Sequence, residues 1–406
     1  MTGRDPHELH RGATPLELLY DLTFVVAFGA ASNEAAHYFA EGHWRTGLIG
    51  FGFAMFAVIW AWIQNTWFAS AYDTDDWIYR LLTMVQMVGV LVLALGLPPM
   101  FESIEQGDRV DNGVMVLGYV IMRAGLVGLW LRVVRHDVVR RRCAGTYAGT
   151  LLVAQVGWIG LAVADVSIAA MFSVAAVLVV IELTGPVVAE HRFGGTPWHP
   201  HHVSERYGLL TIITLGEVIL GTVAAINAVL HFDGWTVETA LVGLAGVGLA
   251  FGMWWMYFVI PSAELLDRFR NRSFGWGYGH VPLFAALAAT GAGLHVAALY
   301  IEHEAHISQL AVVLTTAVPV AVYVICLYAL YSMLTREVDA FHLWLVSGTA
   351  VVVVAAIIMA AVDAPIAACL LVLTLAPAVT VVGYEVVGHR HRAEMLARSG
   401  VESSPG

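Results

Sequence analysis

The sequence predicts an all-α membrane protein that crosses the bilayer about twelve times. Of its 406 residues, 59% are hydrophobic and only 13% are charged, about half of the charged share that is usual in soluble domains. The mean hydropathy is +0.75. Apolar runs of about 20 residues, the length that an α-helix needs to span hydrocarbon, recur along the chain. These features exclude an ordinary soluble globular protein and a disordered protein.

Helices are the expected form of these runs, because lipid satisfies no backbone hydrogen bonds. The alternating ten-residue strands of an outer-membrane barrel do not occur in the sequence. The expected spans are residues 15–39, 45–69, 80–100, 112–134, 147–165, 167–189, 205–229, 236–260, 278–301, 308–335, 341–362 and 365–388.

The arginines predict how the spans are oriented. Seventeen of the 20 basic residues, all of them Arg, fall on the N-terminal side, in segments such as 132–142 and 267–272. Only Arg45 and Arg109 fall on the opposite side. Cytoplasmic loops collect Arg, so both termini are expected in the cytoplasm. The net charge of −11 offers no basic surface for nucleic acid, which leaves the lipid bilayer as the expected partner.

The two halves of the sequence have weakly similar features. Each begins with a polar start, continues into a Trp-rich span and then has a charged loop, at 73–80 in the first half and 264–272 in the second. Six spans in each half would relate the halves by an axis along the membrane normal, as in some transporters. The sequence therefore predicts a 6+6 parallel repeat, with one repeat at 1–200, the other at 201–388 and a short cytoplasmic tail at 389–406.

Two carboxylates begin the first span, in the run TPLELLYD (14–21). Thr14 as N-cap, Pro15 at the first helical position and Glu17 at the third predict a capping box. Glu17 is therefore expected to cap its own helix. Asp21 lies one turn further in, roughly 9 Å from the helix start, where capping explains it less well. We expect Asp21 to be paired with a buried group or to bind a proton.

Arg123 is placed near the middle of the fourth span, roughly 17 Å from its outer end. A guanidinium stays charged, so it needs a carboxylate, a water-filled cavity or an anionic substrate. The candidate partners are Glu182, Glu217 and Asp21. Both a structural ion pair and a functional site remain open at this point. Glu217 lies roughly 18 Å along the seventh span and is a candidate proton carrier or general acid.

Other polar groups in the spans have simpler expected roles. The spacing of Glu34 and His37 is that of half a di-metal site, but no second copy lies in a span, so a polar helix end is expected. Trp60, Trp62 and Trp67 surround Gln64 and Asn65 in the second span. These Trp residues are expected to be interface anchors, or else a stacking wall for a ligand.

Neither the histidines nor the cysteines predict a metal site. Four histidines lie between residues 191 and 202, but Pro197 and Pro200 interrupt this segment, so loop histidines are expected. The three cysteines are scattered and offer no disulfide framework or thiolate site. No metal and no cofactor is expected.

Three separated motifs resemble the bacterial low-temperature-requirement A (LtrA) membrane proteins. They are TPLELLYDLTFVVAF (14–28), AYDTDDWIYRLLTMVQM (71–87) and HHVSERYGLLTIITLGEVILG (201–221). One departure is Leu19 and Tyr20, where the family pattern has paired aromatics. The resemblance implies a multi-pass protein of the bacterial plasma membrane and implies no particular reaction or substrate. The family pattern marks Glu17, Asp21, Asp73, Asp75, Asp76, Arg80, His202, Glu205, Arg206, Gly208 and Glu217.

Two functions fit these features. The first is a secondary transporter or permease that binds substrate or protons at intramembrane charges, with the acidic 73–80 loop and the start of the seventh span as a cytoplasmic gate. The alternative is an intramembrane enzyme that uses a buried carboxylic acid on an isoprenoid or lipid substrate. The sequence favours the transporter and leaves the substrate open. The residues expected to bind substrate or protons are Glu17, Asp21, Arg123, Glu182 and Glu217.

Overall fold

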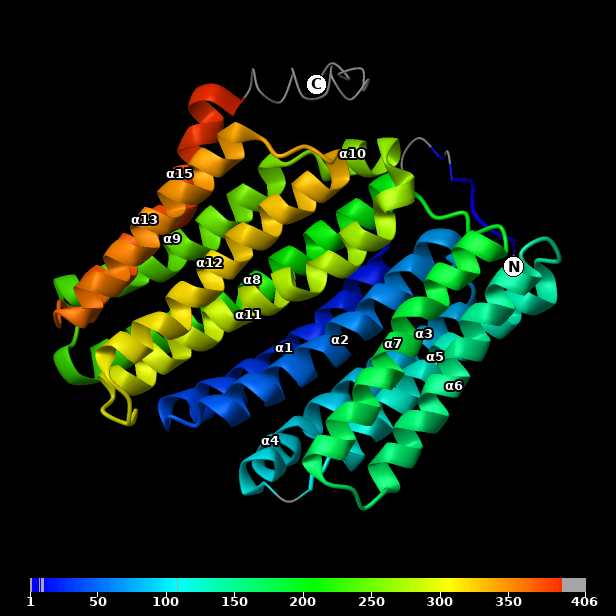
Figure 1. Ribbon diagram of the computed structural model, residues 1–406, viewed down its shortest axis with the longest axis horizontal. Coiled ribbons are helices and arrows are strands. Elements are labelled where there is room, and N and C mark those ends of the chain that lie inside the picture. The colour runs from blue at the N-terminus through cyan, green and yellow to red at the C-terminus, as the bar shows by residue number, and fades with distance from the viewer. Residues whose placement is uncertain (1, 7, 9–10, 108, 389–406) are drawn as a thin grey trace. The chain divides into compact units, whose positions relative to one another are not determined.

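The computed structural model describes residues 2–6, 8, 11–107 and 109–388, and most of these residues are helical (Figure 1). The described ranges contain no strand, so the expected all-α class is confirmed. The expected cytoplasmic tail, 389–406, lies outside the described residues.

The helices follow the apolar runs closely. Short elements are the 3-10 helix Arg270–Arg272 and a π-helical turn at Tyr384–Gly388. The α-helices are α1 (Pro15–Ala40), α2 (Trp44–Tyr72), α3 (Trp77–Leu95), α4 (Leu97–Gln106), α5 (Gly113–His136), α6 (Arg141–Val163), α7 (Ile168–Arg192), α8 (Pro200–Asp233), α9 (Val237–Val259), α10 (Ser262–Arg268), α11 (Ser273–Ile301), α12 (Gln309–Thr335), α13 (Ala340–Ala361), α14 (Ile366–Leu373) and α15 (Leu375–Gly383).

Within the described ranges, twelve helical segments are long and apolar enough to cross a membrane, which confirms the expected number of spans. The helix α8 begins earlier than the hydropathy suggests, at Pro200. Proline suits the first turn of a helix, because the backbone N–H that it lacks has no intrahelical partner there. His201 and His202 therefore lie in a helix, and His191 lies in the last turn of α7, so the expectation of loop histidines is wrong for these three.

The chain forms two compact units. The first consists of Met1–Glu34 and Arg45–Arg206, and the second of Ala35–Trp44 and Tyr207–Gly406. Each unit contains six of the candidate spans, wholly or for the greater part. The helix α1 ends in the second unit, and α8 begins in the first. The expected 6+6 repeat stays a prediction.

Glycines allow α3 and α5 to pack closely in the first unit. A Cβ atom on Gly118 would lie 2.2 Å from the backbone nitrogen of Leu93, and one on Gly89 would lie 2.7 Å from the carbonyl oxygen of Gly118. Small residues at helix interfaces are the usual means of close approach in membranes. This contact holds α5, the helix of Arg123, against α3.

Glycines also bring α8 and α11 together in the second unit. A Cβ atom on Gly221 would lie 2.5 Å from the carbonyl oxygen of Gly291, and one on Gly291 would lie 2.5 Å from the carbonyl oxygen of Glu217. The backbone of α11 therefore passes directly beside Glu217. The side chain of Glu217 begins in a narrow space between two helices.

Candidate functional site

A buried ion pair lies in the first unit, near the middle of two spans. The guanidinium of Arg123 on α5 is 3.0 Å from the carboxylate of Glu182 on α7, and both side chains are 1% exposed. Glu182 was one of the three candidate partners. Since ten residues separate Glu182 from the end of α7, the pair lies roughly 15 Å from that end.

The Glu182 carboxylate accepts hydrogen bonds from four side chains. Oε2 accepts from the indole of Trp60 at 2.6 Å, the hydroxyl of Tyr119 at 2.7 Å and the guanidinium of Arg123 at 3.0 Å. Oε1 accepts from the indole of Trp158 at 2.8 Å. These donors come from α2, α5 and α6. Hydrogen bonds from charged and neutral donors together compensate a carboxylate that has left water.

Arg123 has further partners of its own. Its guanidinium donates to the amide oxygen of Gln64 at 2.9 Å and also to the hydroxyl of Tyr119, and its Cζ lies 4.4 Å from the centre of the Tyr119 ring. Its Nε, however, has no hydrogen-bond partner among the described residues. A fully buried guanidinium therefore keeps an unused donor, and leaving such a donor unpaired is energetically costly.

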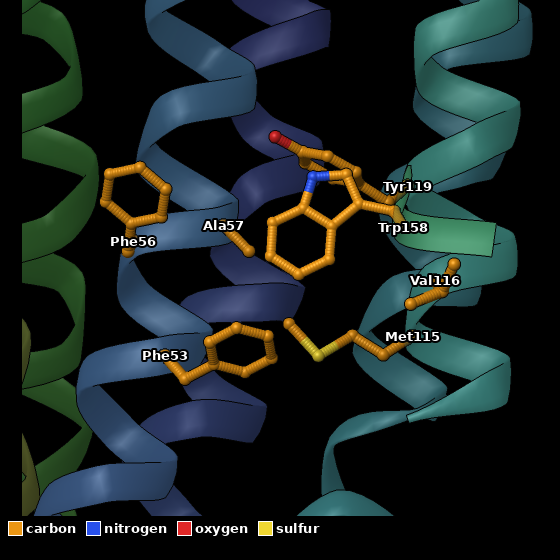
Figure 2. Close-up of a pocket in the computed structure, with 7 residues that line it drawn as sticks. All are labelled: Phe53, Phe56, Ala57, Met115, Val116, Tyr119 and Trp158. Carbon is orange, nitrogen blue, oxygen red and sulfur yellow. The ribbon is translucent and has the colours of Figure 1, made fainter. Parts of the chain in front are cut away.

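A small apolar pocket adjoins this ion pair. Its volume is about 20 Å³. Figure 2 shows Tyr119 and Trp158 next to one another in its wall, so two of the groups that hold Glu182 also line the pocket. The remaining lining side chains carry no charge. They are Phe53, Phe56, Ala57, Met115 and Val116.

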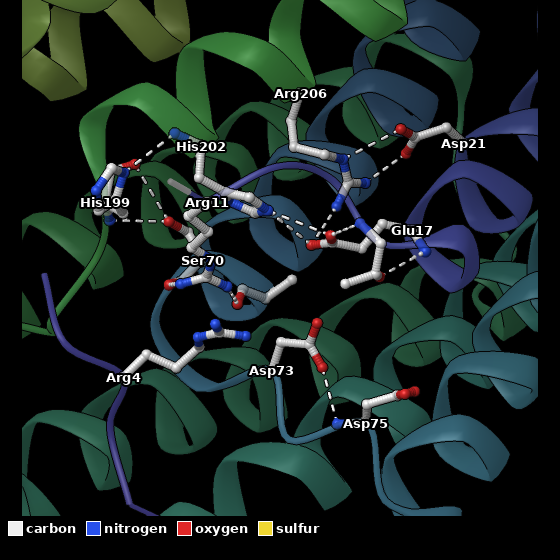
Figure 3. Close-up of polar contacts among 12 residues, drawn as sticks. Arg4, Arg11, Glu17, Asp21, Ser70, Asp73, Asp75, His199, His202 and Arg206 are labelled. Atoms are coloured by element: carbon white, nitrogen blue, oxygen red, sulfur yellow. Dashed lines mark hydrogen bonds and ion pairs between the residues drawn. The ribbon is translucent and has the colours of Figure 1, made fainter. Parts of the chain in front are cut away.

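A second buried cluster joins the start of α1 to the start of α8 (Figure 3). The guanidinium of Arg206 lies 2.8 Å from the carboxylate of Glu17 and donates from Nε to Asp21 at 3.1 Å. A second guanidinium nitrogen also donates to Asp21. The three residues are almost completely buried. One arginine therefore pairs with two carboxylates that lie one helical turn apart.

Glu17 has two roles at once. The backbone N–H of Thr14 donates to its carboxylate at 2.8 Å, and its own N–H donates to the Thr14 hydroxyl at 3.3 Å. The expected capping box is thus present. In addition, the imidazole Nε2 of His202 lies 3.1 Å from the same carboxylate. Glu17 therefore caps α1 and also ties it to α8.

Asp21 is paired with a buried group, which was one of the two roles expected for it. Besides Arg206, the indole of Trp62 donates to it at 2.7 Å. Trp60 and Trp62 are fully buried and both donate to carboxylates. Their interpretation as interface anchors is wrong, because an anchor needs its ring in the headgroup region.

Arg11 caps the C-terminal end of α2 next to this cluster. It is buried and donates to the carbonyl oxygens of Ser70 and Ala69 in the last turn of α2, where carbonyl groups run short of intrahelical partners. Burial, and then repulsion from Arg4, lowers the pKa of Arg11 to about 10, so it stays charged at neutral pH. Figure 3 shows Arg11 next to Ser70.

The acidic turn after α2 gives its three aspartates different environments. Asp73 is buried, and its pKa is raised by burial and then by repulsion from Glu17. Asp75 is exposed and forms a 2.7 Å ion pair with Arg80, whose hydrogen bonds lower the pKa of Asp75. Asp75 also has a φ of 47°, a conformation that Asp tolerates better than most residues.

Asp76 is the N-cap of α3. Its carboxylate accepts from the backbone N–H groups of Ile78 and Tyr79 and forms a 2.8 Å ion pair with Arg132 of α5. The hydrogen bonds from Arg132 hold the pKa of Asp76 well below its usual range. Capping by an aspartate and an ion pair to a neighbouring helix are structural roles.

We expect Asp76→Asn to lower stability at neutral pH and to change its pH dependence. Asn keeps the N-cap but cannot pair with Arg132. Since folding lowers the pKa of Asp76, its contribution is complete above the unfolded pKa of about 4 and declines as the pH falls below it. Thermal unfolding measured between neutral and acidic pH should show the two proteins converging in acid. A constant difference across that range would contradict the ionic role of Asp76.

Glu217 lies in the second unit and is 1% exposed. Its Oε1 has no hydrogen-bond partner, and no cation among the described residues pairs with its carboxyl group. Glu182 is paired with Arg123, and Asp21 is paired with Arg206. Glu217 differs from both in having no counter-charge. Burial without a counter-charge favours the neutral, protonated form of a carboxyl group.

With this geometry established, comparison with known proteins is informative. The sequence profile of the bacterial low temperature requirement A protein (LtrA) family matches residues 12–377. The chain belongs to the LtrA family. It is also similar to an uncharacterized protein of Rhizobium meliloti (strain 1021), with 25% identity over 292 residues, 68% of this chain and 67% of that protein.

The family match covers both buried clusters and Glu217, but not every residue of the LtrA-like motifs joins them. Glu205 is exposed and lies outside the Arg206 cluster. Gly208 allows close approach, because a Cβ atom there would lie 3.0 Å from the ring of Phe258. Glu34 and His37, which were expected to form a polar helix end, lie near the end of α1. Glu34 is half-buried and His37 is exposed. Within the described part of the chain, no three His, Cys, Asp or Glu residues are grouped so that they could hold a metal ion.

Sequence reasoning did not assign Tyr119, Trp158 or Arg11 to the clusters. Tyr119 had a usable signal, because it precedes Arg123 by four residues and so shares its helix face. Gln64 follows Trp60 at the same spacing, and both contact the Arg123–Glu182 pair. Nothing in the sequence pointed to Trp158, since its role depends on how α6 is rotated against α7.

Proposed function

We propose that this LtrA-family protein is a proton-coupled secondary transporter of the bacterial plasma membrane. The observation that carries the proposal is the buried, unpaired carboxyl group of Glu217 in the middle of a membrane span. Ionisable residues inside membranes are costly, and they commonly mark proton relays or substrate pathways. In this proposal Glu217 binds and releases the coupling proton.

The physical argument rests on how the charge of Glu217 depends on its surroundings. A carboxylate without a counter-charge is strongly disfavoured at a dry, buried position, whereas the protonated acid is tolerated. Loss of the proton therefore becomes favourable only when the group reaches water or a cation. Such a group couples proton release to a change in exposure, which is what alternating access requires.

The Arg123–Glu182 pair supports a transport role in the first unit. Buried ion pairs are weak stabilising devices compared with apolar packing, so stability alone gives little reason to hold one in the membrane. The unused Nε donor of Arg123 is also easier to understand in a site that rearranges than in a purely structural contact. We propose this pair as the substrate site.

The orientation in this proposal has both termini in the cytoplasm, which the positions of the arginines support. Arg132, Arg135 and Arg140 lie at the same ends of α5 and α6 as the 73–80 turn. The Arg206 cluster lies at this end of the first unit, and we propose that it acts as the cytoplasmic gate. The enzyme alternative has less support, because Asp21, a buried carboxyl group that could act as its acid, is paired with Arg206 and Trp62.

The test is the variant Glu217→Gln, which keeps the shape of the side chain but cannot exchange a proton. Purified protein is reconstituted in vesicles that contain a pH-sensitive dye, and gradients from a panel of small solutes are imposed. We expect solute-driven proton movement in the wild type and only the background of protein-free vesicles in Glu217→Gln. The matched control is Glu304→Gln, because Glu304 is exposed in a connection between helices.

Infrared difference spectroscopy on a pH change gives a second readout that needs no substrate. The carbonyl band of a protonated carboxyl group should be present in the wild type and in Glu304→Gln, and should be reduced in Glu217→Gln. Proton movement that persists at the wild-type rate in Glu217→Gln would refute Glu217 as the coupling group. Absence of solute-driven proton movement in the wild type across the whole panel would refute proton-coupled transport.

A further inference from the structure

The Glu182 carboxylate occupies a site whose other members are all hydrogen-bond donors to it. Trp60, Tyr119, Arg123 and Trp158 converge on its two oxygens from three other helices, at 2.6–3.0 Å. Nothing in this arrangement is specific to a glutamate side chain. A guanidinium with neutral N–H and O–H donors recognises any carboxylate of suitable size. Glu182 can therefore be regarded as a tethered carboxylate in a carboxylate-binding site.

Two unpartnered groups indicate that this site can take a further ligand. The Nε of Arg123 has no acceptor within the described residues although the side chain is buried. Both amide atoms of Gln155 are likewise unpartnered, and Gln155 is buried on α6 one turn before Trp158. Buried donors without acceptors are rare in folded proteins, and each needs an explanation. A bound carboxylate would supply an acceptor for such a donor.

The adjoining pocket limits what the rest of the ligand can be. Tyr119 and Trp158 belong both to the carboxylate site and to the pocket wall, so the pocket begins where the carboxylate ends (Figure 2). Its other walls are Phe53, Phe56, Ala57, Met115 and Val116. A volume of about 20 Å³ with such walls admits a methyl-sized group and offers no partner for a second charge.

We propose that this site binds a short-chain organic monocarboxylate, whose carboxylate replaces that of Glu182 on Arg123, Tyr119 and the two indoles. This inference rests on the proposed transport function and names its substrate class. Replacement requires that Glu182 first takes up one proton and turns away. The site then holds one guanidinium, one neutral acid and one substrate anion, and so keeps the same net charge as before.

The decisive variant is Glu182→Gln, which resembles the protonated state. A ligand binds more weakly when only a small fraction of the protein is in the state that can bind it. Here that state has a neutral side chain at position 182, so a permanently neutral side chain should tighten binding. We expect Glu182→Gln to bind acetate and propionate roughly tenfold or more tightly than the wild type at neutral pH. In the wild type, affinity should rise by about tenfold per unit fall in pH, as one linked proton requires.

Binding is measured by calorimetry and by thermal stabilisation on the full-length protein in detergent. Propionamide is the neutral control, propylammonium the cationic control, and succinate, chloride and octanoate test a second charge, a simple anion and a lipid-like chain. We expect stabilisation by acetate and propionate alone. Tyr119→Phe removes one donor while keeping the ring, and in the Glu182→Gln background it should weaken binding roughly tenfold.

Several outcomes would overturn the inference. Equal effects of propionate and propionamide would show that no carboxylate is recognised, and equal effects of propionate and chloride would reduce the site to a general anion site. Preference for octanoate would indicate a lipid-derived ligand and contradict the short-chain assignment. Unchanged or weaker binding in a folded Glu182→Gln protein would show that Glu182 does not compete with the ligand. None of these results would affect Glu217-dependent proton movement driven by another solute, so the proposed function is tested separately.

Discussion

Replacing Arg206 with Gln is expected to destabilise the protein by about 3–5 kcal/mol, the range found when one member of a buried ion pair is removed. Among the described residues, Arg206 is the cation within ion-pair distance of Asp21, and it also pairs with Glu17. Without it, two nearly fully buried carboxylates one turn apart repel one another. The hydrogen bonds from Thr14, His202 and Trp62 would remain, but none of these donors is a permanent cation.

The measurement is thermal and chemical unfolding of the purified protein in detergent. The matched control is Arg80→Gln, since Arg80 also forms an ion pair, with Asp75, but these side chains are 61% and 53% exposed. Exposed pairs contribute about 0–1 kcal/mol, so the control should unfold almost as the wild type does. Equal effects of the two substitutions would contradict the buried ion-pair role of Arg206.

A combined variant separates charge from shape. Glu17→Gln and Asp21→Asn, added to Arg206→Gln, remove both unpaired charges while leaving side chains of similar size. We expect this triple variant to recover much of the lost stability, because the penalty arises from uncompensated buried charge. A triple variant less stable than Arg206→Gln alone would mean that the carboxylates contribute mainly through hydrogen bonds such as the Thr14 cap.

The second large effect is expected for Gly118→Ala. The added methyl group would lie 2.2 Å from the backbone nitrogen of Leu93, a distance that real Cβ atoms do not adopt, so α3 and α5 must move apart. Inserting a methyl into a tightly packed contact costs about 1–3 kcal/mol. The loss should also reach the Arg123–Glu182 pair, because Arg123 is on α5 and its neighbour Tyr119 follows Gly118 directly.

Gly149→Ala is the matched control for this prediction. Gly149 lies in α6, and no described atom is within 4 Å of the position that its Cβ would take. In a helix, Ala is favoured over Gly by about 1 kcal/mol, so this substitution should leave the protein as stable or make it more stable. The two substitutions are chemically identical and are expected to differ in sign. A similar change in both melting temperatures would contradict close packing at Gly118.

Part of the candidate site was accessible from sequence. Arg123 and Glu217 were recognisable because charged residues stand out within apolar runs, and Glu17 because a capping box has fixed spacing. The burial of Trp60 and Trp62 was not predictable in this way. An interface anchor and a buried donor have the same residue type and the same hydropathy, and they differ only in which neighbour the helix face meets.

The sequence by itself determined the class of the protein, the number of its spans and the identity of its intramembrane charges. These properties are local, since an apolar run of sufficient length must become a helix in lipid whatever surrounds it. Only the tertiary structure decided that Arg123 pairs with Glu182, that Asp21 pairs with Arg206 and that Glu217 has no counter-charge. Pairing depends on which helices are neighbours and on how each is rotated about its axis, and close glycine contacts between helices help to set both.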